Sequence, residues 1–150
     1  MATRIYRLLA TFLLCALSTF TQAAATSQLQ LQITVLGSCS FVTGEDLVMD
    51  FGELGHGDRT LQSSVPVTCT SGTEFYVRLS DGLYPSGTQR QMAARNGNAR
   101  LPYAITVSPS SGISQGSVID LQLKATVLEA DYATRPIGTY TDTVVLSVNP

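Results

Sequence analysis

The sequence is poor in the residues that enzyme and metal sites commonly require. His56 is the only histidine among 150 residues, and it stands between Gly55 and Gly57, a pattern typical of an exposed turn. A Ser-His-Asp triad would have to use this turn residue. The cysteines form no Cys-x-x-Cys pair, the aspartates lack the spacing of a calcium-binding loop, and residues 52–57 lack the Gly-Lys-Ser/Thr ending of a phosphate loop. We therefore expect no catalytic, metal-binding or cofactor-binding residue, no small-molecule substrate and no enzymatic activity.

Positive charge is scarce as well. Charged residues make up 13% of the chain, with nine Lys and Arg against eleven Asp and Glu. This mildly acidic balance offers no basic patch for a nucleic acid or a membrane surface, so we expect no nucleic-acid partner. Arg90, Arg95 and Arg100 form one small basic cluster. We interpret the cluster as a solvated loop, with a contact to another protein subunit as the alternative.

Residues 1–25 have the pattern of an export signal. Arg4 and Arg7 provide a basic start, and the apolar run that follows them is too short to span a bilayer. Small residues allow cleavage after Ala25, with cleavage after Ala23 as an alternative; an uncleaved membrane anchor is the other interpretation of the segment. Cleavage leaves about 125 residues, which is enough for one domain with its own core. It also removes two of the nine basic residues, so the net charge becomes −4.

The cysteine pattern depends on this cleavage. Cys15 is lost with the signal, which leaves Cys39 and Cys69. An even pair of cysteines in an exported chain predicts a disulfide bond. The bond would close a loop of about 30 residues and contribute roughly 3 kcal/mol to stability. A metal or redox pair is the alternative, but the chain offers few further ligands for zinc or copper.

Short apolar stretches recur along the rest of the chain, and no long amphipathic helix pattern is found. In several of them apolar residues alternate with polar ones, which predicts half-buried β-strands, and Gly, Ser, Pro, Asn and Asp separate the stretches. The stretches lie at residues 47–51, 61–68, 74–80, 101–107, 118–128 and 140–148. We expect residues 82–100 to be a loop with a short strand. Strands of this length and spacing predict an all-β sandwich.

The strictest alternation occupies residues 28–36, at the start of the exported chain. Its apolar side chains share one side of the expected strand: Leu29, Leu31, Ile33 and Val35. A strand with one apolar face needs a sheet edge to pair with, and from the pattern alone that edge belongs either to its own domain or to a neighbouring molecule. The last expected strand ends two residues before Pro150, so we expect its free side to be uncovered.

Motifs distributed over the mature chain resemble those of one protein family. They are the alternating strand that leads into Gly-Ser-Cys at 37–39, Met-Asp-Phe-Gly at 49–52, Val-Thr-Cys-Thr-Ser-Gly-Thr at 67–73, Asp-Gly at 81–82 with Arg-Gln-Met at 90–92, Leu-Pro-Tyr at 101–103, and Pro-Ile-Gly-Thr-Tyr-Thr-Asp-Thr-Val at 136–144. In their order and spacing they resemble a subunit of the archaic chaperone–usher pili, the Csu-type pilins with a spore coat protein U-like domain. The closing Gly-Thr-Tyr-x-Asp before a strand is the most specific of these motifs.

The resemblance implies a fold and a set of site residues. Such pilins have an incomplete immunoglobulin-like β-sandwich that is completed by a strand donated from a neighbouring subunit. Residues 26–36 would be the N-terminal donor strand, with the four apolar side chains named above inserted into the neighbour, and residues 37–150 would be the pilin domain. Cys39 and Cys69 would be its disulfide. The edge of the acceptor groove would be formed by Phe41, Tyr140, Val144, Leu146 and Val148.

The resemblance also implies partners and a location. A periplasmic chaperone would first lend a strand, and an outer-membrane usher would exchange it for the donor strand of the next identical or related subunit. The expected product is a fibre for adhesion and biofilm formation on the surface of a Gram-negative bacterium. Two alternatives remain: a self-contained secreted sandwich, for example a sugar-binding module with residues 28–36 paired internally, or a spore or cell-coat protein.

Overall fold

A computed structural model describes residues 27–44 and 46–150, and the chain divides into two units after Thr34. The expected export signal lies outside the described residues. Residues 27–34 form no helix or strand, and the side chains of Leu29, Leu31 and Ile33 are 84%, 88% and 88% exposed. No helix among the described residues has the length and apolar character needed to cross a membrane.

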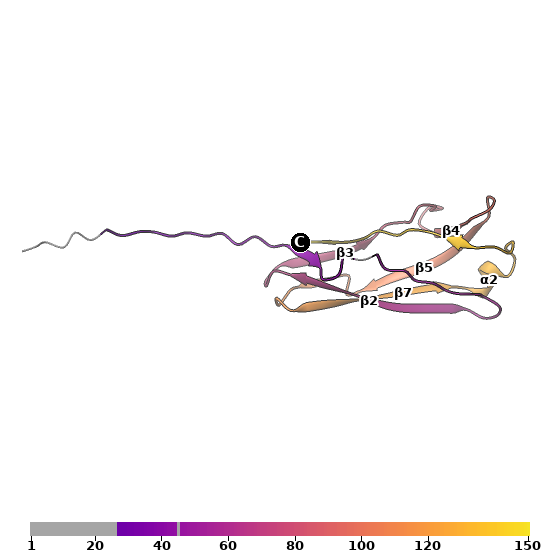
Figure 1. Ribbon diagram of the computed structural model, residues 1–150, viewed down its shortest axis with the longest axis horizontal. Coiled ribbons are helices and arrows are strands. Elements are labelled where there is room, and N and C mark those ends of the chain that lie inside the picture. Colours follow the sequence, from indigo (N-terminus) through magenta and orange to yellow (C-terminus); the bar gives the residue numbers. More distant parts are fainter. Residues whose placement is uncertain (1–26, 45) are drawn as a thin grey trace, which may run out of the picture. The chain divides into compact units, whose positions relative to one another are not determined.

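The second unit, residues 35–150, consists of short strands and one helical turn (Figure 1). In chain order the elements are β1 (Cys39–Phe41), β2 (Arg59–Cys69), β3 (Glu74–Leu79), β4 (Arg90–Ala94), β5 (Arg100–Ser108), β6 (Ser111–Ile113), β7 (Val118–Val127), α2 (Glu129–Tyr132), β8 (Tyr140–Thr141) and β9 (Leu146–Asn149). The prediction of an all-β fold is therefore confirmed. The short strand expected within residues 82–100 is β4.

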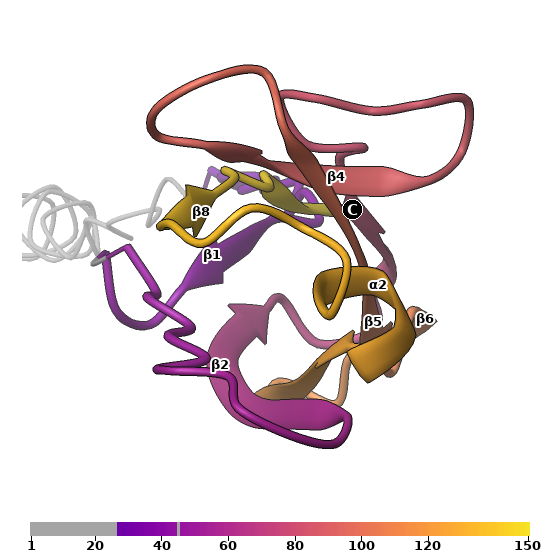
Figure 2. The same ribbon diagram turned by 90° about the vertical axis from the view of Figure 1, so that its right-hand side faces the viewer.

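The strands form two antiparallel sheets. The larger sheet has the order β1-β2-β7-β5-β4-β8, and the smaller sheet has the order β6-β3-β9. The larger sheet curls strongly, so that its two end strands, β1 and β8, come to the same side of the end-on view in Figure 2. In the side view of Figure 1 they lie at opposite ends of the domain. The curl is the ordinary right-handed twist of sheets carried over six strands.

Alternation along the strands fills the space between the sheets. On β7 every second side chain points inward, and Leu121, Leu123, Ala125 and Val127 are buried as a result. One cluster of buried residues comprises Val67, Cys69, Phe75, Val77 and Leu121, and a second comprises Leu101, Tyr103 and Val127. Burial of each large aliphatic side chain contributes about 1.5–3 kcal/mol. The two clusters therefore supply most of the driving force for folding.

The predicted disulfide is confirmed. Cys39 and Cys69 are bonded, 30 residues apart in sequence, and they stand opposite each other in the register of β1 and β2. The bond fastens a strand of only three residues to one of eleven. β1 is thus held to the larger sheet by a covalent link as well as by its backbone hydrogen bonds.

Two expected strands differ from the prediction. The stretch at 140–148 is divided: β8 pairs with β4 in the larger sheet, and β9 pairs with β3 in the smaller one. The division occurs where the chain crosses between the sheets. The stretch at 47–51 forms no strand, because the carboxylate of Asp50 accepts a hydrogen bond from the N–H of Gly52 at 2.8 Å and closes a local turn. Gly52 has a φ of +66°, which favours glycine at this point.

Candidate functional site

The candidate site is the open edge of the sandwich, which we define as β1 on one side and residues 140–149 on the other. β1 is an end strand of the larger sheet and β9 is an end strand of the smaller sheet. The two strands approach each other, and the C-terminus lies beside β1 in Figure 1, yet they share no strand pairing. Each therefore has one side whose N–H and C=O groups are unpaired within the described residues. Such an edge accepts an additional strand readily.

Side chains along the open edge are only half-buried, although they contact the core. Cys39, Leu146 and Val148 pack against the first buried cluster and remain partly exposed. On the opposite face of the same cluster, Leu121 is 0% exposed. The core is thus closed on the side of β7 and open on the side of β1 and β9. An apolar side chain placed at this edge would complete the burial of both strands.

The five residues predicted to border an acceptor groove all lie along the open edge, but they do not form one cluster. Leu146 and Val148 contact the first buried cluster, whereas Tyr140 and Val144 contact the second. Phe41 stands on β1 opposite Val67 and is 41% exposed. Their arrangement extends over the length of the domain. Their role as a binding edge stays a prediction.

The chain that follows β1 also lacks a partner strand. The N–H of Val42 donates to the carbonyl of Pro66 at 3.0 Å, which is one step beyond the pairing of β1 with β2. Farther along, Phe51 and Leu54 place their side chains against the second buried cluster. This part of the chain covers the core with side chains while it contributes no strand to either sheet.

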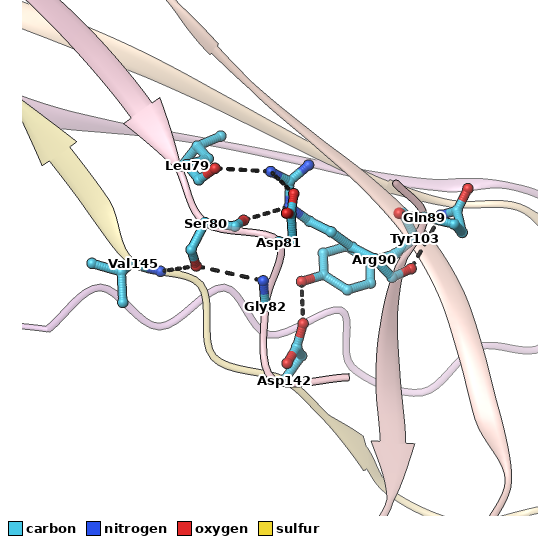
Figure 3. A network of polar contacts seen from close by, with 9 residues as sticks. All are labelled: Leu79, Ser80, Asp81, Gly82, Gln89, Arg90, Tyr103, Asp142 and Val145. Atoms are coloured by element: carbon cyan, nitrogen blue, oxygen red, sulfur yellow. Dashed lines mark hydrogen bonds and ion pairs between the residues drawn. The ribbon is translucent and has the colours of Figure 1, made fainter. Parts of the chain in front are cut away.

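A polar network holds the crossing of the last strand from one sheet to the other (Figure 3). The carboxylate of Asp142 accepts two hydrogen bonds, from the hydroxyl of Tyr103 at 2.6 Å and from the N–H of Leu83 at 2.8 Å. Tyr103 is 6% exposed, and its burial, followed by the hydrogen bond to Asp142, raises the pKa of its hydroxyl far above the ordinary value. The phenol is therefore a persistent donor at the centre of the network.

Ser80 provides the second attachment of this crossing. Its N–H donates to the carbonyl of Val145 at 2.9 Å, and its hydroxyl accepts from the N–H of Val145 at 2.8 Å. The guanidinium of Arg90 donates to the carbonyls of Leu79 and Ser80 at 3.1 and 2.7 Å. The turn after β3 is thereby fixed to β4 and to the last strand together.

The interpretation of Arg90 as part of a solvated loop is wrong, because this residue lies on β4 with a side chain only 18% exposed and donates to two backbone carbonyls. The other residues of the network had no predicted role. The Asp-Gly turn at 81–82 was expected, and Asp142 belongs to the closing motif, but nothing in the pattern indicates that the two meet. Positions 82 and 142 are far apart in sequence, and the pairing of β3 with β9, which continues in the contact of Ser80 with Val145, brings them together. A glycine in a turn and an aspartate before a β-branched run were the available signals.

The described residues were also searched for the side-chain groupings that catalytic or metal sites require. His56 lies 3.8 Å from Glu129, and both side chains are exposed. Among residues 27–44 and 46–150, no group of three or more His, Cys, Asp or Glu side chains is arranged to hold a metal ion.

The chain was compared with models of known protein families. The model of the family described as the Spore Coat Protein U domain, SCPU, matches residues 25–147. This chain belongs to that family. All the motifs quoted from the sequence lie within the matched residues, and the resemblance that they indicated is confirmed. A comparison of this SCPU chain with curated proteins gave no match.

Several solved structures are similar to the SCPU chain, among them the following two. One is a crystal structure of the CsuC–CsuE chaperone–tip adhesion subunit pre-assembly complex from the archaic chaperone-usher Csu pili of Acinetobacter baumannii, with 27% identity over 77% of this chain and 40% of that chain, and a TM-score of 0.48. The other concerns a chaperone–tip adhesin complex in the biogenesis of CFA/I fimbriae, with 15% identity over 75% of this chain and 41% of that chain, and a TM-score of 0.45. The SCPU chain thus spans about two fifths of the length of each.

Proposed function

We propose that this SCPU chain is a structural subunit of a surface pilus that polymerises by donor-strand exchange. Residues 28–36 of one subunit would fill the open edge of the next, between β1 and β9. The observation that carries the proposal is the open edge itself, where two strands with unpaired backbone groups flank a half-buried core. Membership of the SCPU family supports it.

The energetics of such an exchange are favourable. The four apolar side chains of the donor segment are between 73% and 88% exposed: Leu29, Leu31, Ile33 and Val35. Burial of all four would supply about 6–12 kcal/mol before the cost of ordering the segment. Backbone hydrogen bonds to both flanking strands would add affinity, and alternate side chains would add fit.

The same geometry explains why growth would continue. The donor segment and the open edge are different surfaces of one molecule, so their contact is heterologous and does not close on itself. Each added subunit presents a new donor or a new edge, and the product is a filament. We propose export through the periplasm of a Gram-negative bacterium to the cell surface, with adhesion and biofilm formation as the role of the fibre.

This assembly route requires partners. An exported chain with an open apolar edge is an aggregation hazard until the edge is filled. We propose that a periplasmic chaperone covers the edge with a strand of its own and that an outer-membrane usher directs its replacement by the donor segment of another subunit. A structural role of this kind involves no enzymatic activity.

The experiment that tests the function compares the mature chain with a form that lacks residues 26–36, by size exclusion and thermal melting. We expect the complete chain to form heat-resistant oligomers and the truncated form to be a monomer of low stability. A synthetic peptide of residues 28–36 should restore stability, and a control peptide with Leu31→Asp and Ile33→Asp should not. A complete chain that is a stable monomer and loses nothing on truncation would point instead to a self-contained binding module.

A further inference from the structure

The last strand crosses between the sheets at residues 142–145, in the middle of the open edge. β8 lies before this crossing in the larger sheet, and β9 lies after it in the smaller one. The crossing is attached at its two ends, through the side chain of Asp142 and the backbone of Val145. Between these attachments, the N–H and C=O of Val144 have no hydrogen-bond partner among the described residues. They are free to pair with an incoming strand.

The attachment at Asp142 has little freedom. Tyr103 reaches it from β5 (Figure 3), and Leu83 reaches it from the turn after β3, so three parts of the chain meet at one carboxylate. Gly82 closes the site from the side: its φ is +83°, and a Cβ at this position would collide with the carboxylate of Asp142. The arrangement therefore sets the position of the crossing within narrow limits.

We propose that Asp142 is a positioning residue for strand acceptance. It holds the crossing in place before the donor segment arrives, so that β8 and β9 form one continuous edge rather than two separately mobile halves. This inference rests on the proposed function, because it assigns a role within donor-strand exchange. An edge that is correctly placed for only a fraction of the time binds its ligand with an apparent affinity reduced by that fraction.

The test uses the complete mature chain with Leu31→Asp and Ile33→Asp, which disable its own donor segment and leave its open edge available. A labelled peptide of residues 27–36 with the native sequence serves as donor, and its association and dissociation rates are measured by fluorescence. We expect Asp142→Asn to slow association by about tenfold. The dissociation rate should change much less, because an inserted strand then holds the crossing from its other side.

The matched control is Asp58→Asn. The carboxylate of Asp58 also accepts a backbone hydrogen bond, from the N–H of Glu129 at 2.8 Å, but it does so at the start of α2, outside β1 and residues 140–149. We expect peptide association to be unchanged in this variant. Tyr103→Phe removes the hydroxyl donor and keeps the carboxylate, and it should also slow association. Far-UV circular dichroism is used to check that each variant is folded.

Three results would overturn the inference. Association of the Asp142→Asn chain within twofold of its parent would exclude a positioning role, and equal slowing in the Asp58→Asn chain would mean that any loss of stability has this effect. If the parent chain itself fails to bind the peptide, the proposed function is wrong and the inference falls with it. The first two results leave the proposed function intact, so the two failures are distinguishable.

Discussion

At the scale of single residues, the contact between Tyr103 and Asp142 joins a buried phenol to the crossing of the last strand. The hydroxyl is inside the sandwich and donates to the carboxylate at 2.6 Å. Burial, the hydrogen bond and the negative charge of Asp142 all favour the neutral phenol, so the pKa of Tyr103 in the folded protein lies above its value in the unfolded chain.

This contact predicts a stability loss at alkaline pH. Because the folded pKa is the higher one, the contribution of Tyr103 is complete below about pH 10, the pKa of an unperturbed tyrosine, and is lost as the pH rises from there through the folded pKa. At pH 7, Tyr103→Phe should lower the free energy of unfolding by about 1–3 kcal/mol. Thermal melting of both proteins from pH 8 to 11 should narrow the gap between the two curves toward the alkaline end. A gap that is constant with pH would contradict the prediction.

A second prediction at the residue scale concerns the stability of a Gly82→Ala variant. Gly82→Ala forces a non-glycine residue into a φ of +83° and places its Cβ against the Asp142 carboxylate. Gly87→Ala is the matched control, because Gly87 has a φ of +61° but no heavy atom within 4 Å of a Cβ. The control should lose about 1–2 kcal/mol from backbone strain alone. Gly82→Ala should lose about 1–3 kcal/mol more from the collision. Urea unfolding measures both, and equal losses would mean that Asp142 moves aside freely.

At the scale of elements, the sequence pattern was most informative where a strand has one buried face. β2, β3, β5 and β7 were all expected near their observed bounds, since regular alternation along them reflects a regular inward face. The pattern gave a wrong prediction where the backbone leaves sheet pairing. Asp50 turns the chain within a short apolar stretch that was expected to be a strand, and the crossing at residues 142–145 interrupts the last expected strand.

The open edge was partly predictable for the same reason. Its apolar residues could be named from the resemblance to a known family, but the network that positions them could not be predicted. Ser80, Arg90 and Asp142 meet only after β3, β4 and β8 have found their partners in two different sheets. No short window of sequence contains that information. β6 and α2 were missed because three or four residues do not establish a period.

The disulfide supplies a prediction about β1. Substitution of both Cys39 and Cys69 by Ala should lower the free energy of unfolding by roughly 3 kcal/mol, because the bond closes a loop of about 30 residues in the unfolded chain. Hydrogen exchange should show a larger local effect, with the N–H groups of β1 losing protection before those of β2. Treatment of the native protein with a reducing agent should reproduce both effects, and insensitivity to reduction would contradict them.

At the scale of the whole molecule, head-to-tail assembly predicts that a chain without a working donor segment terminates growth. Mature chains with Leu31→Asp and Ile33→Asp can still accept a donor but cannot provide one. Mixed at a low ratio with native chains, they should shorten the oligomers in proportion to their fraction. Gln30→Asp with Gln32→Asp is the matched control, because these side chains alternate to the outward side of the donor strand. Size exclusion with light scattering measures the length distribution, and equal shortening by both pairs would indicate a general effect of charge.

The disulfide also has a mechanical consequence. Tension along a fibre of such subunits would enter each domain through the residues just before Cys39. The covalent bond transfers that load past the three residues of β1 directly to Cys69 on β2, and β2 is paired with β7 along ten consecutive positions. Load applied along two long antiparallel strands is resisted by many hydrogen bonds in shear at once. Reduction of this one bond would redirect the force to β1 and let the domain unravel from its edge.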